Sequence, residues 1–167
     1  SGLHHNHLVS VTDLFAEDVA LVLVRRFVDG ETLQRRIERN GPLAADTLVF
    51  MAKRLAAAVR FVHERGCVHG GIAPDRVLLE RDGSPNLFDF SSGVGGAVGL
   101  YSGPAPKSCF ASPEQRRGYS LVDPLCDVYG LGATLYFAAT ASVSTRSISS
   151  LKSRQTRDKA SLRFFEA

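Results

Sequence analysis

The segment from residue 44 to residue 64 constrains the fold most, because it predicts a long helix with one apolar face. Apolar side chains recur in it every three or four residues, which is the spacing of one side of an α-helix. They are Leu48, Met51, Ala52, Leu55, Val59 and Val62. Arg65 and Gly66 end the pattern. Since 44% of the 167 residues are hydrophobic, the chain can bury the core of one globular domain around such a helix.

Shorter elements surround this helix and predict an α+β fold. Residues 31–39 predict a second helix, which ends at Asn40-Gly41-Pro42. HLVSVTDLF and EDVALVLVRRF predict an antiparallel hairpin that turns at residues 16–18. RVLLE and PNLFDF predict another hairpin that turns at residues 81–83. An apolar helix is predicted over residues 124–139.

Composition excludes several classes of protein. The three cysteines, Cys67, Cys109 and Cys126, are widely spaced and form no C-x-x-C pair, so they predict reduced thiols in a cytoplasmic protein. No apolar run approaches the roughly 20 residues of a membrane helix, and no signal peptide is recognisable. We therefore expect a soluble segment without a membrane partner.

The net charge of +3 belongs mainly to residues 141–167. These residues carry six basic and two acidic side chains and are rich in serine, so we expect a flexible basic tail. Aromatic residues are not interleaved with the basic ones except at Phe164 and Phe165, so no nucleic-acid partner is expected.

Five motifs together resemble the middle of a protein kinase domain, bacterial Ser/Thr kinases in particular. In the order and spacing of that family, the chain has VRRFVDGETL at 24–33, HGGIAPDRVLL at 69–79, LFDFSSG at 87–93, ASPEQRRG at 111–118 and CDVYGLGATLY at 126–136. The resemblance covers about residues 3 to 140. It implies a partial kinase-like fold in residues 1–140, with the hinge region and most of the first half of the helical C-lobe, and with the N-lobe largely missing.

The same resemblance shows which catalytic groups differ. The family's catalytic loop reads H-R-D-L-K-P-E-N, in which the Asp accepts the substrate proton, the Lys steadies the phosphate and the Asn holds magnesium. His69 is kept here, but those three positions are Gly71, Ala73 and Arg76. Loss of a general base alone costs about 10²–10⁴ in rate. No intact catalytic residue is therefore expected.

Asp89 stands at the aspartate of the family's D-F-G motif and is the one remaining candidate metal ligand. Two interpretations of Arg76 stay open. It pairs with Asp89 and occupies the magnesium position, or it points to solvent. A distance far beyond about 4 Å between the two charged groups would exclude the first.

The nucleotide pocket is altered as well. The resemblance places Arg25 at the back of the adenine pocket and Arg26 where the hinge usually has a Glu. A charged side chain in an apolar slot needs a partner or fills the slot itself. The backbone of Phe27 and Val28 could still offer hinge hydrogen bonds to adenine. The phosphate loop, strand lysine and αC glutamate are absent from the chain, so tight ATP binding is not expected.

Structural positions of the family are better preserved than chemical ones. The resemblance implies that His69 stacks on Phe90 and that Asp127 holds the catalytic-loop backbone. It also implies a structural role for Glu114, whose usual arginine partner has no counterpart here. The helix predicted over 124–139 is apolar on most sides, so we expect it to expose a hydrophobic patch that could mediate self-association.

Other candidate sites have simpler explanations. His4, His5 and His7 could bind a metal, but they fall in a turn that the family also has. The glycines of residues 93–99 do not match a dinucleotide loop. Serines in and after this loop could be phosphorylated, although serine is ordinary in loops. They are Ser91, Ser92, Ser102, Ser108 and Ser112.

These observations predict a pseudokinase that binds or scaffolds a protein partner and needs no cofactor. Two alternatives stay open. The chain could be a fragment of a Ser/Thr kinase that transfers phosphate from ATP to protein, in which case ATP and magnesium would be its cofactors. It could also be a non-functional gene fragment, for which poor solubility and no cooperative unfolding are expected.

Overall fold

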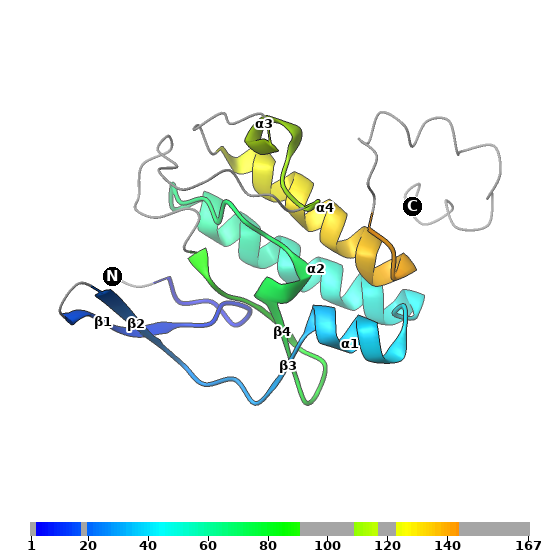
Figure 1. Ribbon diagram of the computed structural model, residues 1–167, viewed down its shortest axis with the longest axis horizontal. Helices are drawn as coiled ribbons and strands as arrows, with labels where there is room; N and C mark the ends of the chain where they lie inside the picture. The colour runs from blue at the N-terminus through cyan, green and yellow to red at the C-terminus, as the bar shows by residue number, and fades with distance from the viewer. Residues whose placement is uncertain (1–2, 18–19, 91–108, 117–122, 144–167) are drawn as a thin grey trace.

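The computed structural model describes residues 3–17, 20–90, 109–116 and 123–143 (Figure 1). A two-stranded hairpin leads into a small three-stranded sheet, and helices α2 and α4 are stacked beside that sheet. In chain order the elements are β1 (Val11–Glu17), β2 (Ala20–Arg25), β3 (Gly30–Thr32), α1 (Leu33–Asn40), α2 (Ala45–His63), the short 3₁₀ helix η1 (Pro74–Arg76), β4 (Val77–Glu80), β5 (Pro85–Leu87), α3 (Pro113–Arg116) and α4 (Pro124–Thr140). None of the helices in these ranges is long and apolar enough to cross a membrane.

The predicted long helix is confirmed as α2, and its apolar face is buried. Met51, Leu55 and Val62 are each at most 1% exposed. The preceding helix is confirmed as α1, but it begins two residues later than predicted. Thr32 caps α1 by accepting a hydrogen bond from the Arg35 amide, and Gly41, with φ of 77°, follows its last residue.

The two predicted hairpins are also confirmed, with shifted ends. β1 pairs antiparallel with β2, and its strand includes Ala16 and Glu17, which the sequence places in the turn. β4 pairs antiparallel with β5, but β5 ends at Leu87 instead of continuing to Phe90. The chain leaves the strand there because Asp89 adopts a left-handed conformation, with φ of 63°.

Three short elements were not predicted: β3, η1 and α3. β3 lies where the sequence predicts the start of a helix, and its residues pair antiparallel with Leu78, Leu79 and Glu80 of β4. Residues 7–9 further extend this sheet, because Val9 donates to the Leu87 carbonyl and Leu87 donates to the His7 carbonyl. β3 and residues 7–9 thus each pair with residues that are distant in sequence.

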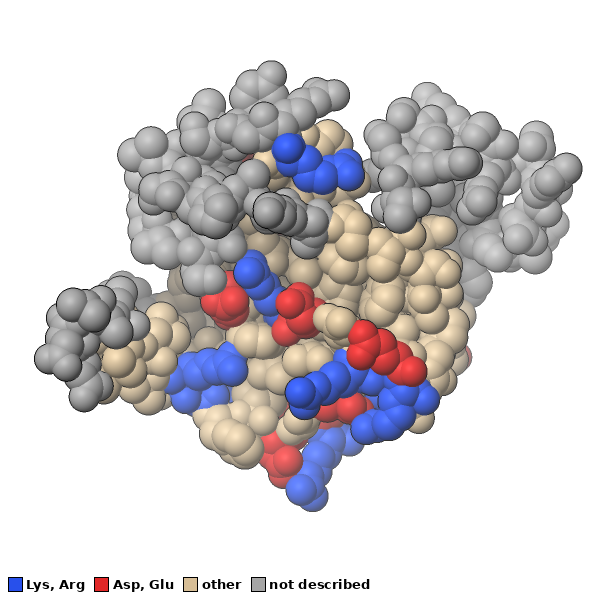
Figure 2. All heavy atoms as spheres, viewed as in Figure 1, with Lys and Arg blue, Asp and Glu red and all other residues tan. Residues whose placement is uncertain are grey.

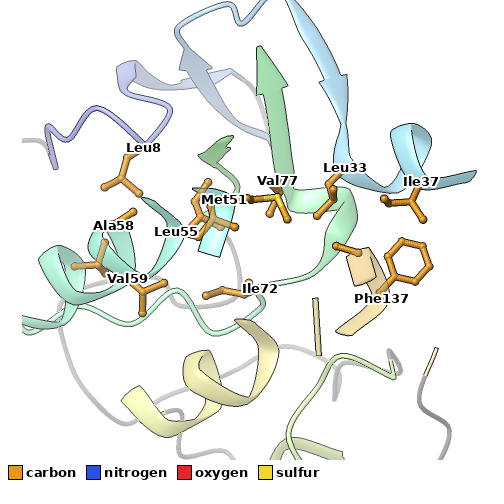
Figure 3. Close-up of a cluster of buried hydrophobic side chains, with 13 residues drawn as sticks. Leu8, Leu33, Ile37, Met51, Leu55, Ala58, Val59, Ile72, Val77 and Phe137 are labelled. Atoms are coloured by element: carbon orange, nitrogen blue, oxygen red, sulfur yellow. The ribbon is translucent and has the colours of Figure 1, made fainter. Parts of the chain in front are cut away.

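One hydrophobic core joins the sheet and the helices (Figure 3). Leu33 and Ile37 of α1, Val77 of β4 and Phe137 of α4 meet side chains of α2 in this cluster. Charged side chains of both signs are mixed over α1 and the neighbouring strands (Figure 2). Two ion pairs there join Arg39 to Glu31 at 2.6 Å and Arg81 to Asp29 at 2.8 Å.

α4 approaches the loop at Ile72 closely because it carries a glycine there. A methyl group at Gly130 would lie 2.8 Å from the Ile72 carbonyl oxygen, whereas one at Gly132 would have no atom within 4 Å. The two glycines therefore face different surroundings within one helix.

Gly130→Ala should destabilise the fold by about 1–3 kcal/mol, because the added methyl group forces α4 and Ile72 apart. Gly132→Ala is the matched control and should be neutral or stabilising by up to about 1 kcal/mol, since alanine favours the helix and meets no neighbour. Urea unfolding at low protein concentration measures both. Equal effects of the two variants would contradict this packing.

Candidate functional site

The loop at residues 69–71 is held by the buried carboxylate of Asp127 in α4. Its Oδ2 accepts the His69 amide and its Oδ1 accepts the Gly70 amide, both at 2.8 Å. The Nε2 atom of His63, at the end of α2, lies 2.8 Å from Oδ2. Asp127 is 1% exposed, so its charge depends on these donors. The predicted contact between Asp127 and the loop backbone is present.

Gln115 also holds Gly70, through the carbonyl group, and was not singled out in the sequence. Its Nε2 donates to the Gly70 carbonyl at 2.8 Å, while its Oε1 accepts the Ser112 amide at 3.0 Å. Gly70 has a φ of 73°, a conformation that favours glycine. The position of Gln115 directly after S-P-E was the only sequence signal for this contact.

His69 stacks on Phe90, as the sequence predicts, with ring centroids 4.5 Å apart. Its Nε2 lies 3.1 Å from the Phe88 carbonyl, which can only accept, so Nε2 carries the proton. Its Nδ1 is buried and has no hydrogen-bond partner among the residues that the structure describes. Burial lowers the pKa of His69 below the ordinary value of 6.5, so the ring is neutral at physiological pH.

Arg76 and Asp89 form an ion pair, with 3.3 Å between Nε and Oδ2. Arg76 also donates from Nη1 to the Gly71 carbonyl at 3.0 Å. The predicted contact is therefore confirmed, and the alternative in which Arg76 points to solvent is wrong. Both side chains are partly exposed, so the pair contributes at most about 1 kcal/mol of stability.

No other chemical group occupies the positions that the resemblance assigns to catalysis. Gly71 offers only its backbone, and Ala73 is a buried residue in an extended conformation just before η1. The nearby thiol of Cys126 is also unsuited to chemistry, because burial raises its pKa to about 12. Besides the exposed Asp75 of η1, the described loop presents backbone groups and the Arg76–Asp89 pair.

The hinge arginines both have partners. The Arg25 guanidinium lies 4.3 Å from the centre of the Phe88 ring, and Arg26 pairs with Glu80 at 3.3 Å. Phe27 is 85% exposed, whereas Val28 is buried. The sequence left two possibilities for Arg25, a partner for its charge or occupation of the apolar slot by the side chain. The first is found, because the guanidinium lies on an aromatic ring.

The remaining candidate residues are dispersed. His7 Nδ1 lies 3.1 Å from the Pro85 carbonyl, and the His5 ring packs on Phe61. Within the described ranges, no three His, Cys, Asp or Glu residues are grouped as metal ligands. Glu114 lies in α3, and no ion pair of its carboxylate is found within those ranges.

Ser112 is fully buried, and its hydroxyl accepts the Gln115 amide, so it is not exposed to a kinase in this folded state. The other candidate serines (Ser91, Ser92, Ser102 and Ser108) and the glycines of residues 93–99 lie outside the described residues. Most of the predicted tail, from residue 144 onward, also lies outside them.

Comparison with known proteins agrees with the motifs. Residues 1–164 match the protein kinase domain family. The chain is 30% identical to the serine/threonine-protein kinase PrkC of Bacillus subtilis over 148 residues, which are 86% of this chain and 22% of that protein. It is 31% identical to serine/threonine-protein kinase F of Synechocystis over 134 residues, which are 74% of this chain and 26% of that protein.

Similar proteins also occur in mouse. Sperm motility kinase 2B is 29% identical over 143 residues, which are 83% of this chain and 29% of that protein. The chain thus spans less than a third of the length of each of these relatives. The similar proteins thus come from both bacteria and a mammal, so the similarity does not indicate the source of this chain.

Asp127→Asn should destabilise the protein by about 2–4 kcal/mol. An asparagine side chain keeps one acceptor oxygen but has an NH₂ group in place of the other. That NH₂ group would face a backbone N–H that also donates, so buried polar groups would be left unsatisfied. Asp123→Asn, at the N-cap of the same helix, is the matched control, because either side chain can cap α4 through the Leu125 amide. Denaturant unfolding with equal losses for both variants would contradict the role of Asp127.

His69 should make the protein less stable in mild acid. Its pKa is lowered by folding, so below about pH 6.5 the unfolded chain binds a proton that the folded chain does not, and stability falls as pH falls. His69→Phe keeps a ring against Phe90 and should flatten the dependence of the unfolding midpoint between about pH 7 and pH 5. The exposed His4→Gln serves as control and should retain the full slope. An unchanged slope in His69→Phe would contradict this assignment.

Proposed function

We propose that this chain, which belongs to the protein kinase family, is a catalytically inactive member, a pseudokinase, that acts by binding another protein. The observation that carries the proposal is the ion pair between Arg76 and Asp89. It puts a guanidinium against the one carboxylate at which the resemblance would place a metal ion.

The residues at this position do not fit magnesium. Mg²⁺ is bound through oxygen ligands, commonly one or two carboxylates and substrate phosphates. Here Asp89 already contacts a cation, and Arg76 stands where the family has an asparagine oxygen. A second cation at Asp89 would have to displace Arg76 and overcome its repulsion.

Proton transfer and phosphate binding lack residues as well. Gly71 has no side chain to accept the proton of a substrate hydroxyl, and Ala73 has no charge to steady a transferred phosphate. At the hinge, Arg25 covers Phe88, so the adenine pocket is altered too. The backbone groups of Phe27 and Val28 remain as candidate hydrogen-bonding partners of adenine, because such bonds need no particular side chain.

The preserved scaffold supports a binding role. Asp127, Gln115 and the His69–Phe90 stack maintain the loop although its catalytic side chains are replaced. A defined surface without catalytic groups is suited to recognising a protein. We also propose a cytoplasmic location, which suits a chain in which Cys67, Cys109 and Cys126 are free thiols.

The competing function is that of a segment of an active Ser/Thr kinase, which transfers phosphate from ATP to protein. It is favoured by the names of the relatives, which are kinases, and by the presence of Asp89. The three replaced catalytic positions weigh against it.

ATP with magnesium should leave the thermal unfolding midpoint of the protein unchanged. A ligand that binds only the folded state raises this midpoint, by about 2.7 kcal/mol of stabilisation at 100 times its dissociation constant. A saturable upward shift, or transfer of labelled phosphate to a protein substrate, would overturn the proposal.

A second measurement isolates the role of Arg76. Arg76→Asn should bind Mn²⁺, measured as loss of the free-ion electron paramagnetic resonance signal, because it frees Asp89 and adds an amide oxygen. Arg81→Asn removes another arginine from an ion pair and should not bind the ion. Equal Mn²⁺ binding by the unchanged protein would show that Arg76 does not block the position.

A further inference from the structure

Residues 5–10, which we call the connecting segment, join the small sheet to the hinge. On one side the His7 carbonyl accepts a hydrogen bond from the Leu87 amide of β5 at 2.9 Å. On the other side the Ser10 carbonyl accepts one from the Arg26 amide of the hinge, also at 2.9 Å. Because β5 leads to the candidate site, a change in the connecting segment reaches both that site and the hinge.

The connecting segment enters the core through a turn. The Leu8 amide donates to the His5 carbonyl at 3.1 Å, which closes a turn over residues 5–8. Leu8 is 2% exposed and lies in the core cluster beside α2 (Figure 3). The next residue, Val9, is 6% exposed. The turn therefore fixes the point at which the segment enters the core.

Two histidines of this turn have opposite tautomers. The His7 amide donates to Nδ1 of His5 at 3.1 Å, so this nitrogen has a free lone pair and the ring of His5 carries its proton on Nε2. In the ring of His7, Nδ1 lies 3.1 Å from the Pro85 carbonyl, which can only accept, so the proton is on Nδ1. While the first contact holds, His5 has no lone pair left for a metal ion.

A proton on Nδ1 of His5 is incompatible with this turn. The new N–H would point at the His7 amide, which also donates. The His5 ring packs on Phe61 with centroids 5.0 Å apart, and the Arg65 guanidinium lies 3.4 Å from the centre of the same Phe61 ring. Among the described residues, the charged and titratable groups that face His5 are therefore His7, on its own segment, and Arg65, just beyond α2.

The surroundings of His5 act in the same direction as this geometry. Burial, and after it the charges of His7 and Arg65, lower the pKa of His5 below its ordinary value of 6.5. The neutral ring, which the turn requires, is thus the form that the folded protein favours.

We propose that His5 is a proton-sensitive contact: its neutral ring holds the connecting segment against β5, and protonation of the ring loosens the segment. The loosened segment binds a proton more readily than the docked one, because the ring then leaves the His7 amide and Arg65. The docked form is therefore fully favoured at neutral pH and loses stability as pH falls below about 6.5. Burial of Leu8 and Val9 still favours docking, so acid raises the population of an open segment without unfolding the protein. This inference does not rest on the proposed function.

Amide hydrogen exchange of the full chain, measured by nuclear magnetic resonance at pH 7.5 and pH 5.5, tests the proposal. Each rate is divided by the intrinsic exchange rate at that pH, which gives a protection factor. Protection of the Val9 and Leu87 amides should fall at least about threefold more than protection of α2 amides. α2 is the reference because the effect of His69 acts on the folded protein as a whole. Equal losses in α2 would overturn the proposal.

His5→Asn should remove this local response to pH. The asparagine oxygen can accept the amide two residues further along the chain, as in an Asx-turn, and the side chain does not titrate. His4→Asn is the matched control, because His4 is the exposed neighbour, and it should keep the full response. A response that persists in His5→Asn, or one that His4→Asn abolishes, would contradict the role of His5.

The ring of His5 can also be followed directly in the unchanged protein, which does not depend on how well a variant folds. Its nitrogen chemical shifts should show the proton on Nε2 at neutral pH and a titration midpoint below 6.5. Protection of Val9 should be lost over the same pH range. A proton on Nδ1 at neutral pH, or a midpoint at or above 6.5, would overturn the proposal.

Discussion

The buried carboxylate of Asp127 is the interaction on which the arrangement of this protein depends. It accepts hydrogen bonds from two consecutive backbone amides, those of His69 and Gly70, and lies against His63. A buried charge is tolerated only when its oxygens are satisfied, so α2, α4 and the loop must hold fixed positions relative to one another. Gln115 adds α3 to the same assembly through the Gly70 carbonyl.

The side chains of the loop stand within this fixed frame. The resemblance to the kinase family places Gly71, Ala73 and Arg76 at the positions that the family uses for catalysis, whereas the groups that fix the backbone are present. Arg76 now ties Asp89 to the Gly71 carbonyl. The loop therefore keeps its shape through backbone hydrogen bonds and gains an internal ion pair in place of an open carboxylate.

Much of the fold and part of the site could be predicted from local pattern. α2 and α4 follow from apolar spacing, and the β4–β5 hairpin follows from its turn residues. Because the chain belongs to a known family, its motifs also indicated the Asp127 contact and the His69–Phe90 stack. The Arg76–Asp89 pair was one of two possibilities, since charge alone does not say where a long side chain lies.

The sequence by itself determined the three longer helices, the residue types at the positions that the resemblance assigns to catalysis, and the apolar character of α4, because these are properties of residue type and short-range spacing. Only the tertiary structure decided that β3 is a strand, that Gln115 clamps Gly70, and that Gly130 and Gly132 face different surroundings. Each of these depends on a partner brought close by folding. Spacing along the chain carries no record of such distant contacts.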